Sequence, residues 1–154
     1  MKRIMLISLF ALWQTVAVFS QANADDIVGY YLVAEPKTGD KAQMEIYRTA
    51  NGKYEGKIVW VENKSQSENV GTIQVKNLAY DSKTGEWKNG KVLYDGGEYS
   101  VNISFIEPKK LKVRGYLGIS LLGKTVYWTK EEGLRRTTVY LDKTNFFIPP
   151  FIET

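Results

Sequence analysis

The sequence contains no histidine and no cysteine among its 154 residues. Without histidine, the chain cannot form a Ser–His–Asp triad, a Cys–His catalytic pair or the usual histidine-based zinc and iron sites. Without cysteine, it has no disulfide to stabilise it in an oxidising compartment. These two absences exclude the commonest catalytic and zinc-binding arrangements, and they leave stability to the hydrophobic core.

The first 24 residues have the layout of a secretory signal peptide. Lys2 and Arg3 form a basic start, residues 4–19 are mostly apolar, and Ala22-Asn23-Ala24 offers a small-x-small cleavage site. The apolar run is shorter than the ~20 residues that a membrane span needs, which favours a removed leader over a retained anchor. We therefore predict a signal peptide over residues 1–24, export to the periplasm and no stable membrane insertion after cleavage.

Cleavage after Ala24 would leave residues 25–154, which are 130 of the 154 residues and enough for one domain with a single core. Removal of Lys2 and Arg3 reduces the 21 basic residues to 19, against 17 acidic residues. The net charge of +2 that remains does not predict nucleic-acid binding. We expect a single β-barrel domain over residues 25–154 that does not bind nucleic acid.

Apolar and polar residues alternate along much of this domain, with the two-residue period of a strand that buries one face. The clearest stretch is 111–128, where Leu111 and Val113 share one parity and Lys112 and Arg114 the other. The same pattern predicts strands at 27–34, 43–49, 53–62, 87–94, 99–105, 111–119 and 125–129. Both a broken strand and a helical turn fit 72–81, and a further strand over 136–141 would bring the number to nine.

This succession of short strands at hairpin spacing, without a helix, predicts an all-β barrel or sandwich. A small antiparallel up-and-down barrel is favoured, because closure removes the exposed strand edges. An outer-membrane barrel is the rival, and it needs an apolar lipid-facing side on nearly every strand. The outward faces of two successive strands carry polar or charged residues, which indicates a barrel surrounded by water. They are Ser100, Asn102 and Ser104 on one strand and Lys112 and Arg114 on the next.

The stretch 111–128 also carries a family resemblance. The run LKVRGYLG, followed by LLGKT and a tryptophan, resembles the bacterial family catalogued as domain of unknown function 2147. Gly29, residues 52–58 (GKYEGKI) and residues 87–92 (WKNGKV) also match, so the similarity covers roughly 26–130. Gly96 departs from the proline that the family pattern leads us to expect after Asp95. The resemblance implies an exported envelope protein with a calycin or lipocalin-like barrel, and it implies no reaction.

Six large aromatic residues fall on the face that the alternation assigns to the barrel interior. Rings with polar atoms line many ligand pockets, although they also fill closed cores. We predict that these six line a pocket for a small apolar or amphipathic molecule: Tyr31, Tyr54, Trp60, Tyr99, Phe105 and Trp128. The alternative is a structural or protein-interaction module of the cell envelope with a solid core.

The sequence predicts no catalytic residues, no metal site and no cofactor. Adjacent acidic residues such as Asp25-Asp26 and Glu131-Glu132 point to opposite faces if they lie on a strand, so they do not converge on a cation. The segment Asp95-Gly96-Gly97-Glu98 has too few side-chain oxygens for the six to eight ligands that calcium takes. We therefore expect a binding or structural protein rather than an enzyme.

Four local expectations concern the loops and the hairpin of residues 111–128. The polar segment 63–71, from Asn63 to Gly71, should be the most mobile loop. The apolar tail 145–154 should pack on the barrel. Gly115 should mark a strand bend or a close packing contact, so that Gly115→Val would overpack it. Trp128 should close one end of the barrel.

Overall fold

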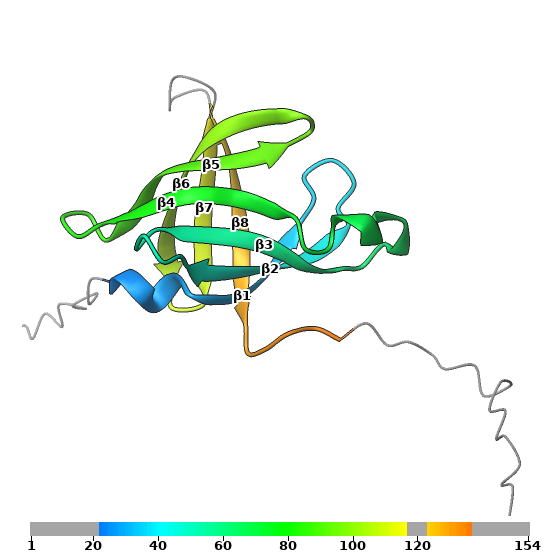
Figure 1. The fold of residues 1–154 in the computed structure, drawn as a ribbon, viewed down its shortest axis with the longest axis horizontal. Helices are drawn as coiled ribbons and strands as arrows, with labels where there is room; N and C mark the ends of the chain where they lie inside the picture. The colour runs from blue at the N-terminus through cyan, green and yellow to red at the C-terminus, as the bar shows by residue number, and fades with distance from the viewer. Residues whose placement is uncertain (1–21, 117–122, 137–154) are drawn as a thin grey trace, which may run out of the picture.

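In the computed structural model, residues 22–116 and 123–136 are described, and they form a closed antiparallel barrel (Figure 1). Each strand pairs with the next along the chain, and β1 also pairs with β8, which closes the barrel. This confirms the predicted all-β up-and-down architecture. The eight strands are β1 (Gly29–Ala34), β2 (Lys41–Arg48), β3 (Tyr54–Val61), β4 (Ile73–Asp81), β5 (Glu86–Tyr94), β6 (Gly97–Glu107), β7 (Lys110–Tyr116) and β8 (Lys124–Glu131).

Two short 3-10 helices accompany the strands, one before β1 and one between β3 and β4, contrary to the expectation of a domain without helices. The first, η1 (Ala24–Ile27), occupies the place where the first strand was expected to begin, and Ile27 is fully buried. The second, η2 (Lys64–Asn69), lies in the polar segment 63–71. The Asn63 side chain accepts a hydrogen bond from the Ser65 backbone N–H at 3.1 Å and so caps η2. The polar segment therefore contains a short capped helix.

Irregularities in several strands break the strict alternation of the sequence. In β3, Trp60 pairs with Gln43 while Ile58 pairs with Met44, so Val59 is an extra residue that shifts the parity. In β4 and β5, Asn77 and Asn89 both have φ of 59°, a left-handed conformation that asparagine tolerates better than most residues. The segment 72–81 is therefore mostly a strand, β4, with a local irregularity at Asn77.

Two glycines allow neighbouring strands and side chains to approach closely, and neither is Gly115. A Cβ on Gly56 would lie 2.8 Å from Met44 Sδ, and a Cβ on Gly90 would lie 2.5 Å from Leu78 Cδ2. A Cβ on Gly115 would meet nothing nearer than 3.9 Å. The expectation of close packing at Gly115 is therefore wrong, because this glycine borders open space inside the barrel.

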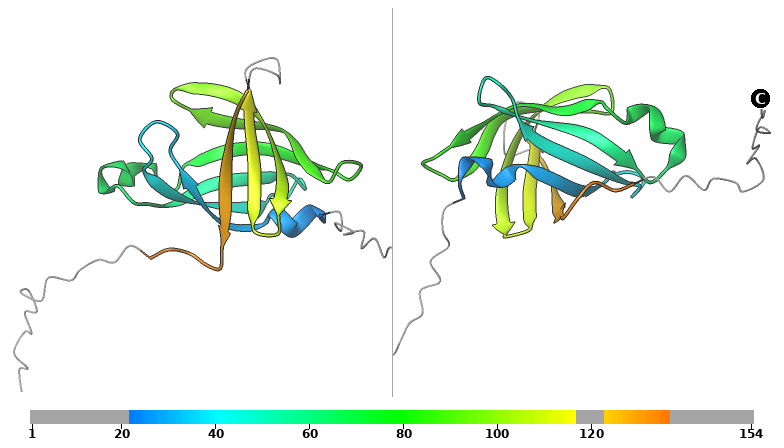
Figure 2. Two further views of the ribbon diagram at one scale, coloured as in Figure 1. Left: turned by 180° about the vertical axis from the view of Figure 1, so that it is seen from behind. Right: turned by 60° about the horizontal axis from the view of Figure 1, so that its bottom comes forward.

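The two ends of the barrel differ. Figure 2 shows η1 at one end, and η2 together with the β1–β2 loop at the other. We call the end that carries η1 the closed end and the opposite one the open end. The buried core contains Ile27, Tyr31, Met44, Ile46, Tyr54, Ile58, Val75, Leu78, Trp87, Val101, Ile103, Leu111, Val113 and Trp128.

Several sequence-based expectations concern residues outside the described ranges. They are the leader up to residue 21, the last residues of the strand expected at 111–119, almost all of the possible strand at 136–141, and the tail 145–154. Among the described residues, no helix is long and apolar enough to cross a membrane.

Candidate functional site

A cavity of about 940 Å³ occupies the half of the barrel nearest the open end. Its wall is built mainly from aliphatic side chains that point inward from most of the strands. The apolar lining includes Val33, Ala42, Met44, Ile58, Val61, Val92, Val101, Val113, Val126 and Trp128. Pockets of this kind, apolar inside with a few polar groups, are typical of small-molecule sites, which commonly span ~300–1,000 Å³.

Strand β8 shows how the sequence positions this lining. Lys124, Val126 and Trp128 share one parity and all line the cavity, whereas Tyr127 between them is 54% exposed on the outside. Trp128 pairs with Leu111 of β7 and is almost completely buried, so it lies where the cavity meets the packed core. The alternation thus places a cation at the cavity mouth and an indole ring deep inside.

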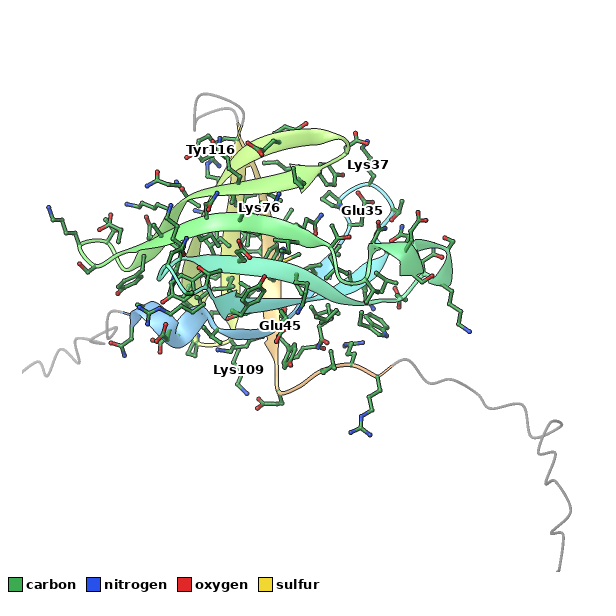
Figure 3. The ribbon with its side chains drawn as sticks, viewed as in Figure 1. Glu35, Lys37, Glu45, Lys76, Lys109 and Tyr116 are labelled. Carbon is green, nitrogen blue, oxygen red and sulfur yellow. The ribbon has the colours of Figure 1, made fainter. Side chains whose placement is uncertain are left out.

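Polar contacts across the mouth join the β1–β2 loop to the β5–β6 hairpin. Tyr94 donates its hydroxyl to Glu35 Oε1 at 2.7 Å, and Lys37 Nζ lies 2.5 Å from Asp95 Oδ2. Figure 3 shows Glu35 and Lys37 on their loop beside the tip of that hairpin. Because all four residues line the cavity, these contacts fix part of its rim.

The Glu35 carboxylate is the most perturbed group at the mouth. The Tyr94 hydroxyl and the Thr38 and Lys37 backbone N–H groups all donate to it. These donors stabilise the ionised form and lower the pKa of Glu35 to about 2, with the Tyr94 bond as the largest cause.

The lowered pKa makes the mouth contacts sensitive to acid. Because the folded-state pKa of Glu35 lies below its ordinary value of 4.5, the ionised carboxylate stabilises the fold above about pH 4.5, and the effect is lost as the pH falls towards 2. We expect Glu35→Gln to lower the unfolding midpoint at pH 7 and to match the wild type near pH 2. The unfolding midpoint is measured in denaturant between pH 2 and pH 7, and Glu68→Gln in η2 is the control. A difference that is the same at every pH would contradict this prediction.

The closed end is packed with rings whose polar atoms bind the N-terminal segment of the same chain. Tyr31 donates to the Ile27 carbonyl at 2.8 Å, and Tyr54 donates to Asp25 Oδ1 at 2.6 Å. Burial and the Asp25 carboxylate raise the pKa of Tyr54 to about 12, and burial likewise raises the pKa of Tyr31. These hydroxyls are therefore already used within the fold.

Trp87 is the central ring of this closed end. It is fully buried, its ring centroid lies 5.2 Å from that of Tyr80 and 5.7 Å from that of Phe105, and its Nε1 donates to the Ala24 carbonyl at 3.0 Å. Trp87 is not among the six aromatic residues that the sequence predicts to face the interior. The bulge at Asn89 shifts the parity between Trp87 and Gly90, so both face inward.

The structure divides the six predicted lining residues into three groups. Tyr99 and Trp128 line the cavity. Tyr31, Tyr54 and Phe105 lie in the packed closed end instead. Trp60 lies on the outer face, because the bulge at Val59 turns it away from the interior, and Arg135 lies over its ring at 5.0 Å. Most of the cavity wall is aliphatic, whereas the six residues predicted from the sequence are all aromatic.

The outer face that carries Trp60 also holds a buried polar residue, Gln43. Its Nε2 donates to Glu131 Oε2 at 2.7 Å and to the Gly133 carbonyl at 2.8 Å, while its Oε1 accepts from the Arg135 backbone N–H at 2.8 Å. Arg135 in turn pairs with Glu131. These bonds hold the segment after β8 against β2 and β3.

Replacing Gln43 by alanine tests this attachment. The change leaves the Glu131 carboxylate and two backbone groups without their buried partner, so we expect it to lower the free energy of unfolding by about 1–3 kcal/mol. Gln74→Ala is the control, since Gln74 makes one longer bond, 3.2 Å, to the Leu93 carbonyl. Denaturant unfolding of both variants gives the comparison, and equal losses would contradict a special role for Gln43.

Comparisons with known proteins give one family and one solved structure. The model of a family described as "Uncharacterized protein conserved in bacteria (DUF2147)" matches residues 29–130. The solved structure of protein HP1028 from Helicobacter pylori, which is described as belonging to the lipocalin family, is similar with a TM-score of 0.57 and 18% identity. That similarity covers 73% of this chain and 92% of the HP1028 chain, and it shows the fold. No curated protein sequence matches.

Proposed function

Because this chain belongs to the bacterial DUF2147 family and folds as a lipocalin-like barrel, we propose that it is a carrier or sensor that binds one small apolar or amphipathic molecule in its cavity. An eight-stranded barrel is just wide enough to hold one small ligand. The cavity is the observation that supports this proposal. The alternative, a structural module of the envelope, would have a packed interior instead.

The chemistry of the cavity suggests how such a molecule would lie. Val101, Val113 and Val126 would contact its apolar part, and Trp128 would pack against its inner end. The polar rim, which includes Tyr94 and Lys124, would face any polar end. A ligand of this kind would bind mainly through removal of apolar surface from water, at about 25 cal/mol per Å².

We also propose that the protein works outside the cytoplasm and acts by binding rather than catalysis. The basic start and apolar run of residues 1–24 support export. The absence of histidine and cysteine supports a binding role, because it removes the usual nucleophile–base pairs. Among the described residues, no group of three or more acidic side chains gathers as a metal site would require.

The first experiment looks for a molecule that accompanies the protein. The full chain is expressed with its leader in a Gram-negative host, purified from the periplasm without detergent, and analysed by native mass spectrometry. We expect a second mass peak, heavier by one small molecule, that collapses to the protein mass after extraction with organic solvent. A single peak at the protein mass, together with no uptake from a mixture of bacterial lipids, would contradict the proposed binding function.

A further inference from the structure

We propose that Ala22, Asn23 and Ala24 remain in the mature protein, so that the export cleavage occurs before Ala22, at the bond after Ser20, and not at the bond after Ala24. This inference rests on the proposed export. The small-x-small pattern of Ala22-Asn23-Ala24 would place the cut after Ala24, but in the structure these three residues are part of the closed end of the barrel.

Ala24 supplies the hydrogen-bond acceptor for a buried indole. Trp87 is fully buried, and its Nε1 donates to the Ala24 carbonyl at 3.0 Å. An indole N–H can only donate, so it needs an acceptor. A chain that begins at Asp25 lacks this carbonyl and has an α-ammonium group, another donor, close to the same position. The cut after Ala24 would therefore leave a buried donor unpaired, which is destabilising.

Asn23 and Ala22 also make contacts that belong to the fold. The Asn23 backbone N–H donates to Asp26 Oδ2 at 2.7 Å, and the Asp26 N–H donates to the Asn23 carbonyl at 3.1 Å, so Asn23 caps the start of η1. The Tyr80 hydroxyl donates to the Ala22 carbonyl, and the side chains of Ala22 and Ala24 pack against the core. All three residues thus belong to the closed end: Asn23 caps η1, and Ala22 and Ala24 pack against the core.

The sequence contains another possible cleavage site that would keep residues 22–24 in the mature protein. Ser20 is a small residue directly after the apolar run of residues 4–19, and Val18, two positions before it, is a short aliphatic residue, so Val18-Phe19-Ser20 approximates the small-x-small pattern of a leader's end. Cleavage after Ser20 makes Gln21 the first residue and keeps all the contacts of residues 22–24. A cleavage site after Ser20 is therefore compatible both with a leader of this layout and with the contacts at the closed end.

Mass spectrometry of the exported protein tests the proposal directly. The full chain is expressed with its leader, purified from the periplasm, and its intact mass and N-terminal sequence are determined. We expect the first residue to be Gln21. A chain that begins at Asn23 or Asp25 would overturn this inference while leaving export intact. A full-length chain that keeps Met1 would contradict the proposed export and, with it, the inference.

A second experiment measures what residues 21–24 contribute. Two forms, starting at Gln21 and at Asp25, are released from a cleavable tag and melted thermally. We expect a lower unfolding temperature for the form that starts at Asp25. The difference in unfolding temperature between the two forms should be smaller when both carry Trp87→Phe or Tyr80→Phe, because these side chains no longer donate to the Ala24 or Ala22 carbonyl. Equal midpoints, or a gap that neither variant reduces, would overturn the structural role of residues 22–24.

Discussion

Replacing Trp87 by alanine is expected to lower the free energy of unfolding by about 3–5 kcal/mol, the usual cost of truncating a large buried ring. The ring is fully buried between Tyr80 and Phe105, and its Nε1 bonds the Ala24 carbonyl. A domain of this size has about 5–15 kcal/mol of stability in total, so the loss is a large part of it. Denaturant unfolding followed by circular dichroism measures the effect.

Trp128→Ala is the matched variant, because Trp128 is also buried but lines the cavity. Since fewer atoms pack on this ring, we expect a smaller loss of stability than for Trp87→Ala, together with weaker ligand binding. If Trp87→Ala does not fold, Trp87→Phe keeps much of the volume, removes the bond to Ala24, and should fold with reduced stability. A larger stability loss for Trp128→Ala than for Trp87→Ala would contradict a barrel that is packed at its closed end and hollow towards its open end.

Gly90→Val should also be strongly destabilising. A Cβ at this position would lie 2.5 Å from Leu78 Cδ2 and 2.8 Å from Val101 Cγ1, so the branched side chain forces buried neighbours to move. Overpacking of a core costs about 1–3 kcal/mol, and we expect a value near the upper end. Thermal and denaturant unfolding give the measurement.

Gly115→Val is the control for that change, since it adds the same atoms to another inward-facing glycine. Here the nearest atoms to a new Cβ are the Ser100 carbonyl oxygen at 3.9 Å and Val92 Cγ1 at 4.0 Å. We expect its stability to remain within about 1 kcal/mol of the wild type, as for changes away from crowded positions. Equal destabilisation by both variants would mean that the open half of the barrel is as tightly packed as the closed half.

The alternation of residues was enough to predict the barrel but not the division of its interior. Leu111, Val113 and Gly115 of β7 follow the period without interruption, and the structure places them as the period predicts. Where an extra residue enters a strand, the parity changes, and the sequence carries no clear sign of it at Val59. Trp60 was therefore assigned inside although it lies outside.

The same limit applies to the closed end. Trp87 is absent from the predicted interior set, and the shift at Asn89 means that the inward parity of Gly90 does not extend back to it. Tyr31 and Tyr54 were correctly assigned to the interior, but their hydroxyls bind η1 rather than open space. Which inward residue faces a void and which faces another side chain depends on how the N-terminal segment closes the barrel, and residue periodicity does not contain that information.

Whether the barrel is hollow at its open end is tested most directly by the binding of an apolar fluorescent probe, N-phenyl-1-naphthylamine, to the solvent-extracted protein and two variants. Gly115→Phe adds a ring inside the cavity, where the wild type has room, while Lys112→Phe adds the same ring on the outer face of the same strand. We expect saturable binding at one site for the wild type and Lys112→Phe, and no binding for Gly115→Phe in a protein that remains folded. Equal binding by all three proteins, or no saturable binding by the wild type, would contradict it.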